Sequence, residues 1–209
     1  MRVAIYGSFE PFMTFFGYQA IQIPEVSKEF FDKHQEIDYV VLYDLGNSVE
    51  ECLRAFMTVT ELAHRFKKVI WISKERNFTN TILERLSVLE RNVVCLRMYK
   101  LIDTSDEFLS KCINDASVTI ENDMYVDYFD PVDICRVIQM CMIKTKLPYR
   151  IDLVYKDKYK LSQLAEMVGA ACDIQGETKE EYTGLRGPID LEFDPMSTLI
   201  SRLKEKSHS

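Results

Sequence analysis

The stretch from Ile37 to Ile72 decides the fold class. It opens with Ile-Asp-Tyr-Val-Val-Leu-Tyr (37–43) and closes with Val-Ile-Trp-Ile (69–72), two apolar runs of the kind found in buried parallel strands. Between them Ser48 precedes Glu51 by three residues, the spacing of a capping box at a helix start. Apolar residues then recur on one helix face: Val49, Cys52, Phe56, Val59 and Ala63. A strand, a helix and a strand in direct succession predict a βαβ unit.

The same alternation continues on both sides of this unit. Strands are expected before it at Val3–Tyr6 and Tyr18–Ile23. After it, a helix is expected over 79–90 and a buried strand over Val93–Leu96. We therefore predict an α/β protein with a Rossmann-like, doubly wound parallel sheet.

The pattern changes after residue 103. The elements expected in this later part are a helix that starts at Asp130-Pro131, a strand at Ile151–Tyr155, a helix from Leu161 to about Gly169, and a last helix over 195–206. We expect residues 1–103 to form the Rossmann-like core, with a shortened first crossover. Residues 104–209 are expected to form the remaining sheet edge and a small, reduced C-terminal α/β region.

Composition argues against several functions. The net charge is -7, with 33 acidic and 26 basic residues, and there is no basic stripe, so we expect no nucleic-acid partner. No apolar run approaches the ~20 residues of a membrane helix, and Met1–Tyr6 reads as a strand, not a signal peptide. The six cysteines lack C-x-x-C spacing and the three histidines are scattered, which favours reduced thiols, a cytoplasmic location and no metal site.

Four stretches together resemble the extended short-chain dehydrogenase/reductase family of sugar-nucleotide epimerases, dehydratases and reductases. Asp38–Gly46 is similar to that family's fourth strand and the turn after it, and Ser48–Ser73 to its long helix with a strand ending in serine. Leu83–Arg97 is similar to the family's helix and strand ending in arginine. Val126–Met167 is similar to its Val-x-Asp-Val segment followed by a Ser-x-x-Glu-Leu-Ala helix. The resemblance implies the Rossmann-like fold and, in the family, NAD or NADP as cofactor.

The turn after the first strand departs from the family pattern. A dinucleotide-binding member cradles pyrophosphate on a glycine-rich turn, because any Cβ there blocks the approach of the phosphates. Here the turn reads Gly-Ser-Phe-Glu-Pro-Phe (7–12), and Glu10 would put a carboxylate where phosphates lie. The weak candidates that remain for cofactor contacts are Gly7, Ser8, Asp44 and Gly46.

The catalytic pair of the family is also missing. The family uses a tyrosine for proton transfer and a lysine four residues later, yet none of the 11 tyrosines has lysine at that spacing. The resemblance places Arg76 and Asn80 at those two positions. If the chain is active, the candidates by position are Ser73, Arg76 and Tyr99. Tyr43 and Asp44 are further candidates by position.

Two functional interpretations follow. The first is a non-catalytic relative that has no cofactor and acts in binding or assembly, with a protein partner or with itself, as in a larger particle assembled in the cytoplasm. Its interface candidates are the aromatic residues Phe9, Phe12, Phe15 and Phe16, together with Tyr18, although these side chains are equally suited to fill the space of a missing helix. The alternative is an NAD(P)-dependent sugar-nucleotide epimerase, dehydratase or reductase with an atypical site.

A third interpretation has less support. The opening Gly-Ser-Phe-Glu-Pro-Phe (7–12) is similar to the start of nucleotidylyltransferases. That family continues with a His-x-Gly-His signature, and the corresponding segment here, Thr14–Tyr18, contains no histidine.

Overall fold

The computed structural model describes residues 1–7, 10–43, 48–74, 91–102, 106–176 and 191–207. The chain forms two compact units, and neither is continuous in sequence. The first contains Met1–Arg97 and Cys135–Ile151, and the second contains Met98–Ile134 and Asp152–Ser209. The domain boundary expected at residue 103 stays a prediction. The segment 135–151, which follows that boundary in sequence, belongs to the first unit.

The first unit is built on a six-stranded sheet with the order β10-β5-β4-β3-β1-β2. Its strands are β1 (Val3–Tyr6), β2 (Ala20–Ile23), β3 (Tyr39–Tyr43), β4 (Lys68–Lys74), β5 (Val93–Met98) and β10 (Arg150–Asp152). β1 pairs in parallel with both β2 and β3, and β3 pairs in parallel with β4. The predicted Rossmann-like α/β fold is confirmed.

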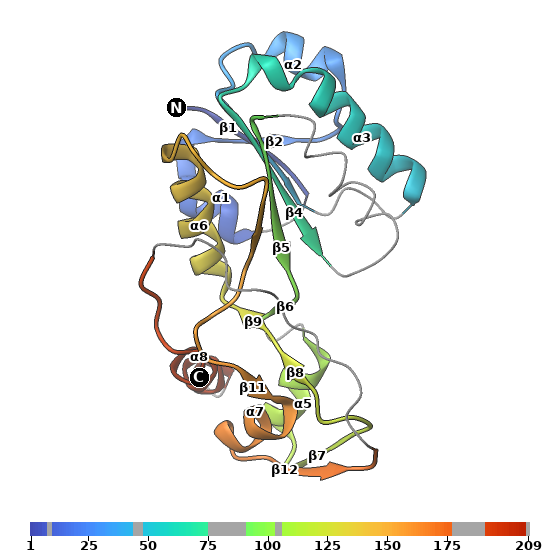
Figure 1. Cartoon of the computed structure of the whole chain (residues 1–209), viewed down its shortest axis with the longest axis vertical. Coiled ribbons are helices and arrows are strands. Elements are labelled where there is room, and N and C mark those ends of the chain that lie inside the picture. Colours follow the sequence, from blue (N-terminus) through green and yellow to red (C-terminus); the bar gives the residue numbers. More distant parts are fainter. Residues whose placement is uncertain (8–9, 44–47, 75–90, 103–105, 177–190, 208–209) are drawn as a thin grey trace. The chain divides into compact units, whose positions relative to one another are not determined.

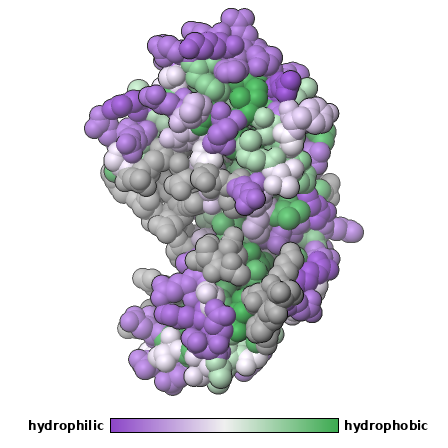
Figure 2. Space-filling view, turned by 180° about the vertical axis from the view of Figure 1, so that it is seen from behind, coloured by the Kyte–Doolittle hydropathy of each residue, from purple (hydrophilic) through white to green (hydrophobic). Residues whose placement is uncertain are grey.

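Helices cover both faces of this sheet (Figure 1). α2 (Lys28–Lys33) and α3 (Val49–Glu61) lie on one side, and α1 (Glu10–Phe16) and α6 (Pro131–Ile143) lie on the other. Two short 3-10 turns, Gly17–Gln19 and Ala63–Arg65, follow α1 and α3. The outer surface over α2 and α3 is mainly hydrophilic (Figure 2), as expected for amphipathic helices on a sheet.

Local sequence explains where these helices begin. The Ser48 hydroxyl accepts a hydrogen bond from the Glu51 amide at 3.2 Å, which confirms the predicted cap of α3. Ser27 caps α2 in the same way by accepting from the Phe30 amide at 3.3 Å. We did not predict α2 from the sequence, because it has only six residues and too few apolar positions to show a helical period.

The core under α2 and α3 is mainly aliphatic and includes pairs of aromatic side chains. Trp71 of β4 meets Phe56 of α3 edge-to-face at 5.5 Å, and Phe31 of α2 packs on Phe66 at 5.1 Å. All four side chains are buried. Between β1 and β2 the described chain has the seven-residue α1 and the 3-10 turn; the shortened first crossover stays a prediction.

The second unit is a smaller α/β structure of paired short strands and helices. β7 (Ser117–Ile120) pairs in parallel with β12 (Ala171–Ile174), and β6 (Lys100–Leu101) pairs in parallel with β9 (Tyr128–Phe129). β8 (Tyr125–Val126) pairs antiparallel with β11 (Tyr159–Lys160). The helices are α5 (Glu107–Asn114), α7 (Leu161–Met167) and α8 (Met196–Ser207).

The start of α6 is fixed from within the second unit. The Asp130 carboxylate accepts from the Val132 amide at 2.8 Å, which confirms the predicted helix start. The Tyr155 hydroxyl donates to Asp133 at 2.8 Å and accepts from the Asp130 amide at 3.0 Å, and its ring stacks on Phe129 at 4.5 Å. Burial and the adjacent Asp133 carboxylate raise the pKa of Tyr155 far above its ordinary value, so this hydroxyl keeps its proton.

The predicted helix over 79–90 lies outside the described residues. Within the described part of the chain no helix is long and apolar enough to cross a membrane, and no group of three His, Cys, Asp or Glu side chains is arranged to hold a metal ion. All six cysteines are free thiols.

Candidate functional site

The turn at the carboxyl end of β1 is governed by backbone packing. Gly7 has φ +103°, and a Cβ built on it would lie 1.7 Å from the carbonyl oxygen of Tyr43 at the end of β3. The Gly7 carbonyl accepts a hydrogen bond from the Gln22 side chain at 3.2 Å. Glycine is therefore required here by the close approach of two strand ends.

This turn only partly suits a dinucleotide. The positive φ of Gly7 matches the first glycine of a phosphate-binding turn, which makes the sharp bend. Glu10, however, stands in the first turn of α1, where its carboxylate repels phosphate. Ser8, Asp44 and Gly46, the other candidates for cofactor contacts, lie outside the described residues. The backbone conformation of Gly7 is therefore compatible with the phosphates of NAD(P), whereas the negative charge of Glu10 is not.

The candidate catalytic residues are placed as follows. Ser73 lies near the end of β4 with a relative exposure of 1%, and Tyr99 lies in the second unit with 4%. Tyr43 ends β3 and is also buried, with its ring edge-to-face on Phe12 at 5.6 Å. Arg76 and Asn80 lie outside the described residues. Ser73 and Tyr43 belong to the first unit and Tyr99 to the second.

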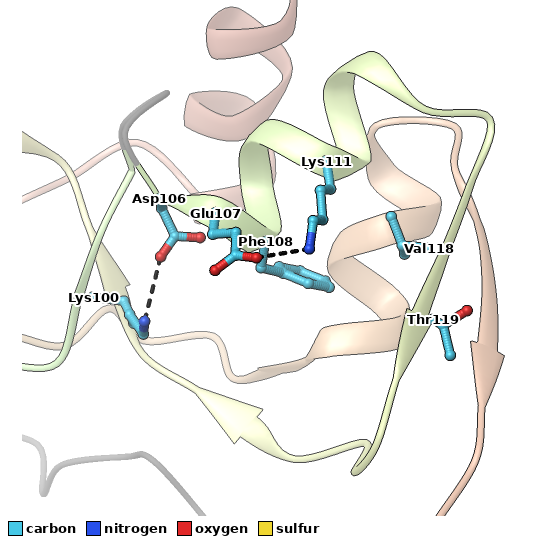
Figure 3. Close-up of a pocket in the computed structure, with 7 residues that line it drawn as sticks. All are labelled: Lys100, Asp106, Glu107, Phe108, Lys111, Val118 and Thr119. Carbon is cyan, nitrogen blue, oxygen red and sulfur yellow. Dashed lines mark hydrogen bonds and ion pairs between the residues drawn. The ribbon is translucent and has the colours of Figure 1, made fainter.

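The second unit contains a pocket that the sequence did not lead us to expect. It has a volume of about 240 Å³ and lies between β6, α5 and β7 (Figure 3). Its lining residues are Lys100, Asp106, Glu107, Phe108, Lys111, Val118 and Thr119. Figure 3 shows the Phe108 ring below the Lys111 ammonium group and the Glu107 carboxylate between the two lysines.

The pocket carries two cations, and each has a carboxylate beside it. Lys111 lies 2.7 Å from Glu107, and Lys100 lies 3.5 Å from Asp106. The Asp106 side chain is held firmly, since its other oxygen accepts from the Leu109 amide at 3.0 Å and from the Tyr128 hydroxyl at 2.9 Å. The Glu107 side chain is 83% exposed, and its ion pair is with Lys111 on the same helix.

The electrostatics of the pocket follow from these contacts. The hydrogen bond and charge of Lys111, with a smaller contribution from Lys100, hold the pKa of Glu107 below its usual value. Glu107 in turn raises the pKa of Lys111. Both groups are therefore ionised near neutral pH, and the pocket offers ammonium groups that suit an anion beside an aromatic ring that suits a planar group.

Comparison with known proteins identifies the fold. No family model matches the chain, and no curated protein matches it. Among solved structures, the UDP-N-acetylglucosamine 4-epimerase from Bacillus cereus superposes with a TM-score of 0.73 at 8% identity, over 100% of this chain and 96% of the other. The GDP-mannoheptose C4 reductase from Campylobacter jejuni, solved with NADP bound, gives 0.70 at 12% identity over 100% and 98%. A GDP-L-fucose synthetase from Naegleria fowleri gives 0.70 at 9% identity over 97% and 91%.

The chain has the fold of the extended short-chain dehydrogenase/reductases. The resemblance stated from the four sequence stretches is therefore confirmed for the fold. All three solved structures are named as sugar-nucleotide epimerases, reductases or synthetases, and they match this chain across both of its units.

In this dehydrogenase-like fold the aromatic N-terminal residues are divided between core and surface. Phe12 and Phe16 are 0% and 6% exposed, so these two side chains fill the core and offer no face to a partner. Phe15 and Tyr18 are 39% and 86% exposed. Phe9 lies outside the described residues. Among the three described phenylalanines that were predicted for an interface, Phe15 is substantially exposed.

The sequence contained a usable signal for the helix that lines the pocket, but not for the pocket itself. Asp106 precedes an apolar helix as a cap, and Glu107 and Lys111 stand four residues apart on its first turns. That pattern predicts a helix start with an ion pair. It does not predict Lys100 and Thr119, because their strands reach α5 only through the tertiary fold.

Proposed function

We propose that the protein acts on a nucleotide-linked sugar, as an atypical relative of the NAD(P)-dependent epimerases and reductases. The observation that carries this proposal is the pocket of the second unit within a fold that sugar-nucleotide enzymes share. Lys100 and Lys111 supply cations for phosphate oxygens, and Phe108 supplies an apolar ring for a base or sugar.

The size of the pocket limits what it holds. Its 240 Å³ is below the ~300–1,000 Å³ of sites that enclose a whole drug-sized ligand. We expect it to take one part of the ligand, a phosphate with the adjoining ring, while the rest extends beyond the pocket.

Calorimetric titration of the full chain with UDP-N-acetylglucosamine and GDP-mannose tests the proposal, in the presence and absence of NAD(H) or NADP(H). We expect saturable binding of at least one nucleotide sugar, weakened by Lys100→Met and Lys111→Met. Lys33→Met, which changes an exposed lysine of the first unit, is the matched control. If neither nucleotide sugar binds under any of these conditions, the proposal is wrong.

A second candidate is a binding or assembly protein without catalysis. Glu10 in the first turn of α1 favours it, as does the absence of any tyrosine followed four residues later by lysine. The same titrations separate the two. Binding of a dinucleotide with a change in nicotinamide absorbance on adding nucleotide sugar supports the enzyme. Nucleotide-sugar binding without dinucleotide binding supports the non-catalytic protein.

A further inference from the structure

The Glu107 side chain occupies the cationic part of the pocket. Its carboxylate lies 2.7 Å from the Lys111 ammonium group and stands between Lys111 and Lys100 in Figure 3. The lowered pKa of Glu107 reflects both lysines, with Lys111 the main cause. The Glu107 carboxylate pairs with the Lys111 ammonium group, which a phosphate group would also use, whereas Lys100 pairs with Asp106.

The two carboxylates of the pocket differ in freedom. Asp106 is 9% exposed, caps α5 and accepts from the Tyr128 hydroxyl, so it cannot leave. Glu107 is 83% exposed and pairs with Lys111 on the same helix. Exposed ion pairs four residues apart on a helix are weak, so the Glu107 side chain can rotate away at small cost.

We infer that Glu107 is a built-in competitor: an anionic ligand gains Lys111 only by displacing the Glu107 carboxylate. This inference rests on the proposed function, because it concerns the same pocket and the phosphate charge of the same ligand. Because a ligand must compete with Glu107 for Lys111, the pocket favours ligands that carry more than one negative charge, such as nucleoside diphosphates, over uncharged nucleosides.

Variants of the two partners separate competition from a merely structural ion pair. We expect Glu107→Gln to strengthen binding of UDP, and Lys111→Met to weaken it. A carboxylate removed from within a few ångström of a bound phosphate changes affinity on the order of three- to tenfold at low salt. An ion pair that only stabilises α5 would change affinity in the same direction in both variants, since either substitution breaks it.

The experiment is calorimetric titration of the full chain with UDP and with GDP, using uridine as the uncharged probe. Glu50→Gln is the matched control, because Glu50 and Arg54 form the same kind of exposed pair on α3 at 2.8 Å. Circular dichroism and melting temperature of each variant verify that the fold is retained, as expected for exposed side chains.

The outcomes are distinguishable. Opposite shifts for Glu107→Gln and Lys111→Met with UDP or GDP, no shift for Glu50→Gln, and little effect of Glu107→Gln on uridine support the inference. Wild-type protein that binds a diphosphate with an affinity that Glu107→Gln leaves unchanged or lowers overturns the inference alone. No binding of UDP or GDP to any variant, alongside no binding of nucleotide sugars, overturns the proposed function and the inference with it.

Discussion

The side-chain ammonium group of Lys68 donates hydrogen bonds to the carbonyl oxygens of Cys141 at 2.8 Å and Lys144 at 2.6 Å. Lys68 lies at the start of β4, and the two carbonyls lie at the carboxyl end of α6. Helix carbonyls there lack partners within the helix, and the negative end of the helix dipole attracts a cation. Burial lowers the pKa of Lys68, which is 8% exposed.

Lys68→Met should therefore destabilise the first unit. The substitution keeps the length of the side chain but leaves two carbonyl oxygens without their donor, at a cost of about 1–3 kcal/mol. Trp71, the only tryptophan, is buried in the same unit, so its fluorescence during urea unfolding reports the change. Lys33→Met is the control, and an equal effect of both variants would contradict the assigned role.

Gly7 and Gly17 give a matched pair for backbone strain. A Cβ on Gly7 would lie 1.7 Å from the Tyr43 carbonyl oxygen, whereas a Cβ on Gly17 meets nothing within 4 Å, although both have positive φ. We expect Gly7→Ala to cost on the order of 4 kcal/mol, as clash and strain add. Gly17→Ala should cost only about 1 kcal/mol. Urea unfolding followed by tryptophan fluorescence checks both values.

Asp38 should make the stability of the first unit sensitive to acid. Its carboxylate lies 2.7 Å from Lys67 and accepts from the Arg2 amide at 3.0 Å, and the hydrogen bond to Lys67 is the main reason that its pKa is below 3.8. A lowered folded pKa means that the stabilisation is present above pH 3.8 and is lost as the pH falls through the folded value.

Asp38→Asn and Lys67→Met should each reduce this loss. The measurement is the free energy of urea unfolding at about pH 7 and about pH 3, on either side of the ordinary range for aspartate. Lys33→Met serves again as control and should keep the wild-type dependence. If the free energy of unfolding of Asp38→Asn falls between about pH 7 and about pH 3 as much as that of the wild type, other groups govern acid unfolding.

The aromatic N-terminal segment provides a further test. Phe12 is fully buried against Tyr43, so Phe12→Ala should cost about 3–5 kcal/mol by leaving a cavity. Phe15 is 39% exposed, and Phe15→Ala should cost less than about 1 kcal/mol.

Sedimentation velocity of Phe15→Ala and of Tyr18→Ala against wild type tests the interface prediction, because a self-association that depends on these side chains would be weakened.

Much of the first unit could be predicted from sequence. Buried parallel strands leave continuous apolar runs, and β1, β3, β4 and β5 each have one. The caps at Ser48 and Asp130 predicted two helix starts correctly. The predicted strand at Ile151–Tyr155 was shifted: β10 ends at Asp152, and the chain continues to Tyr155 outside the sheet.

The second unit was harder to predict because its strands are short and pair across long separations. Ser117–Ile120 alternates between exposed and buried positions for only four residues, and its partner Ala171–Ile174 lies on the far side of α6 and α7 in sequence. Periodicity over such lengths does not distinguish a strand from a loop. The pocket followed from this unit, so the lysines and carboxylates that line it could not be grouped from sequence alone.

The discontinuity of the first unit has a consequence for synthesis of the protein. A nascent chain that has emerged up to residue 103 already contains five of the strands of the sheet, but β5 still has an unpaired edge and Lys68 has no helix carbonyls to bind. The pairing strand and the carbonyls are supplied only when 135–151 leaves the ribosome, after the first segment of the second unit, Met98–Ile134. The edge of β5 is therefore exposed to chaperones, or to a wrong strand, throughout that interval.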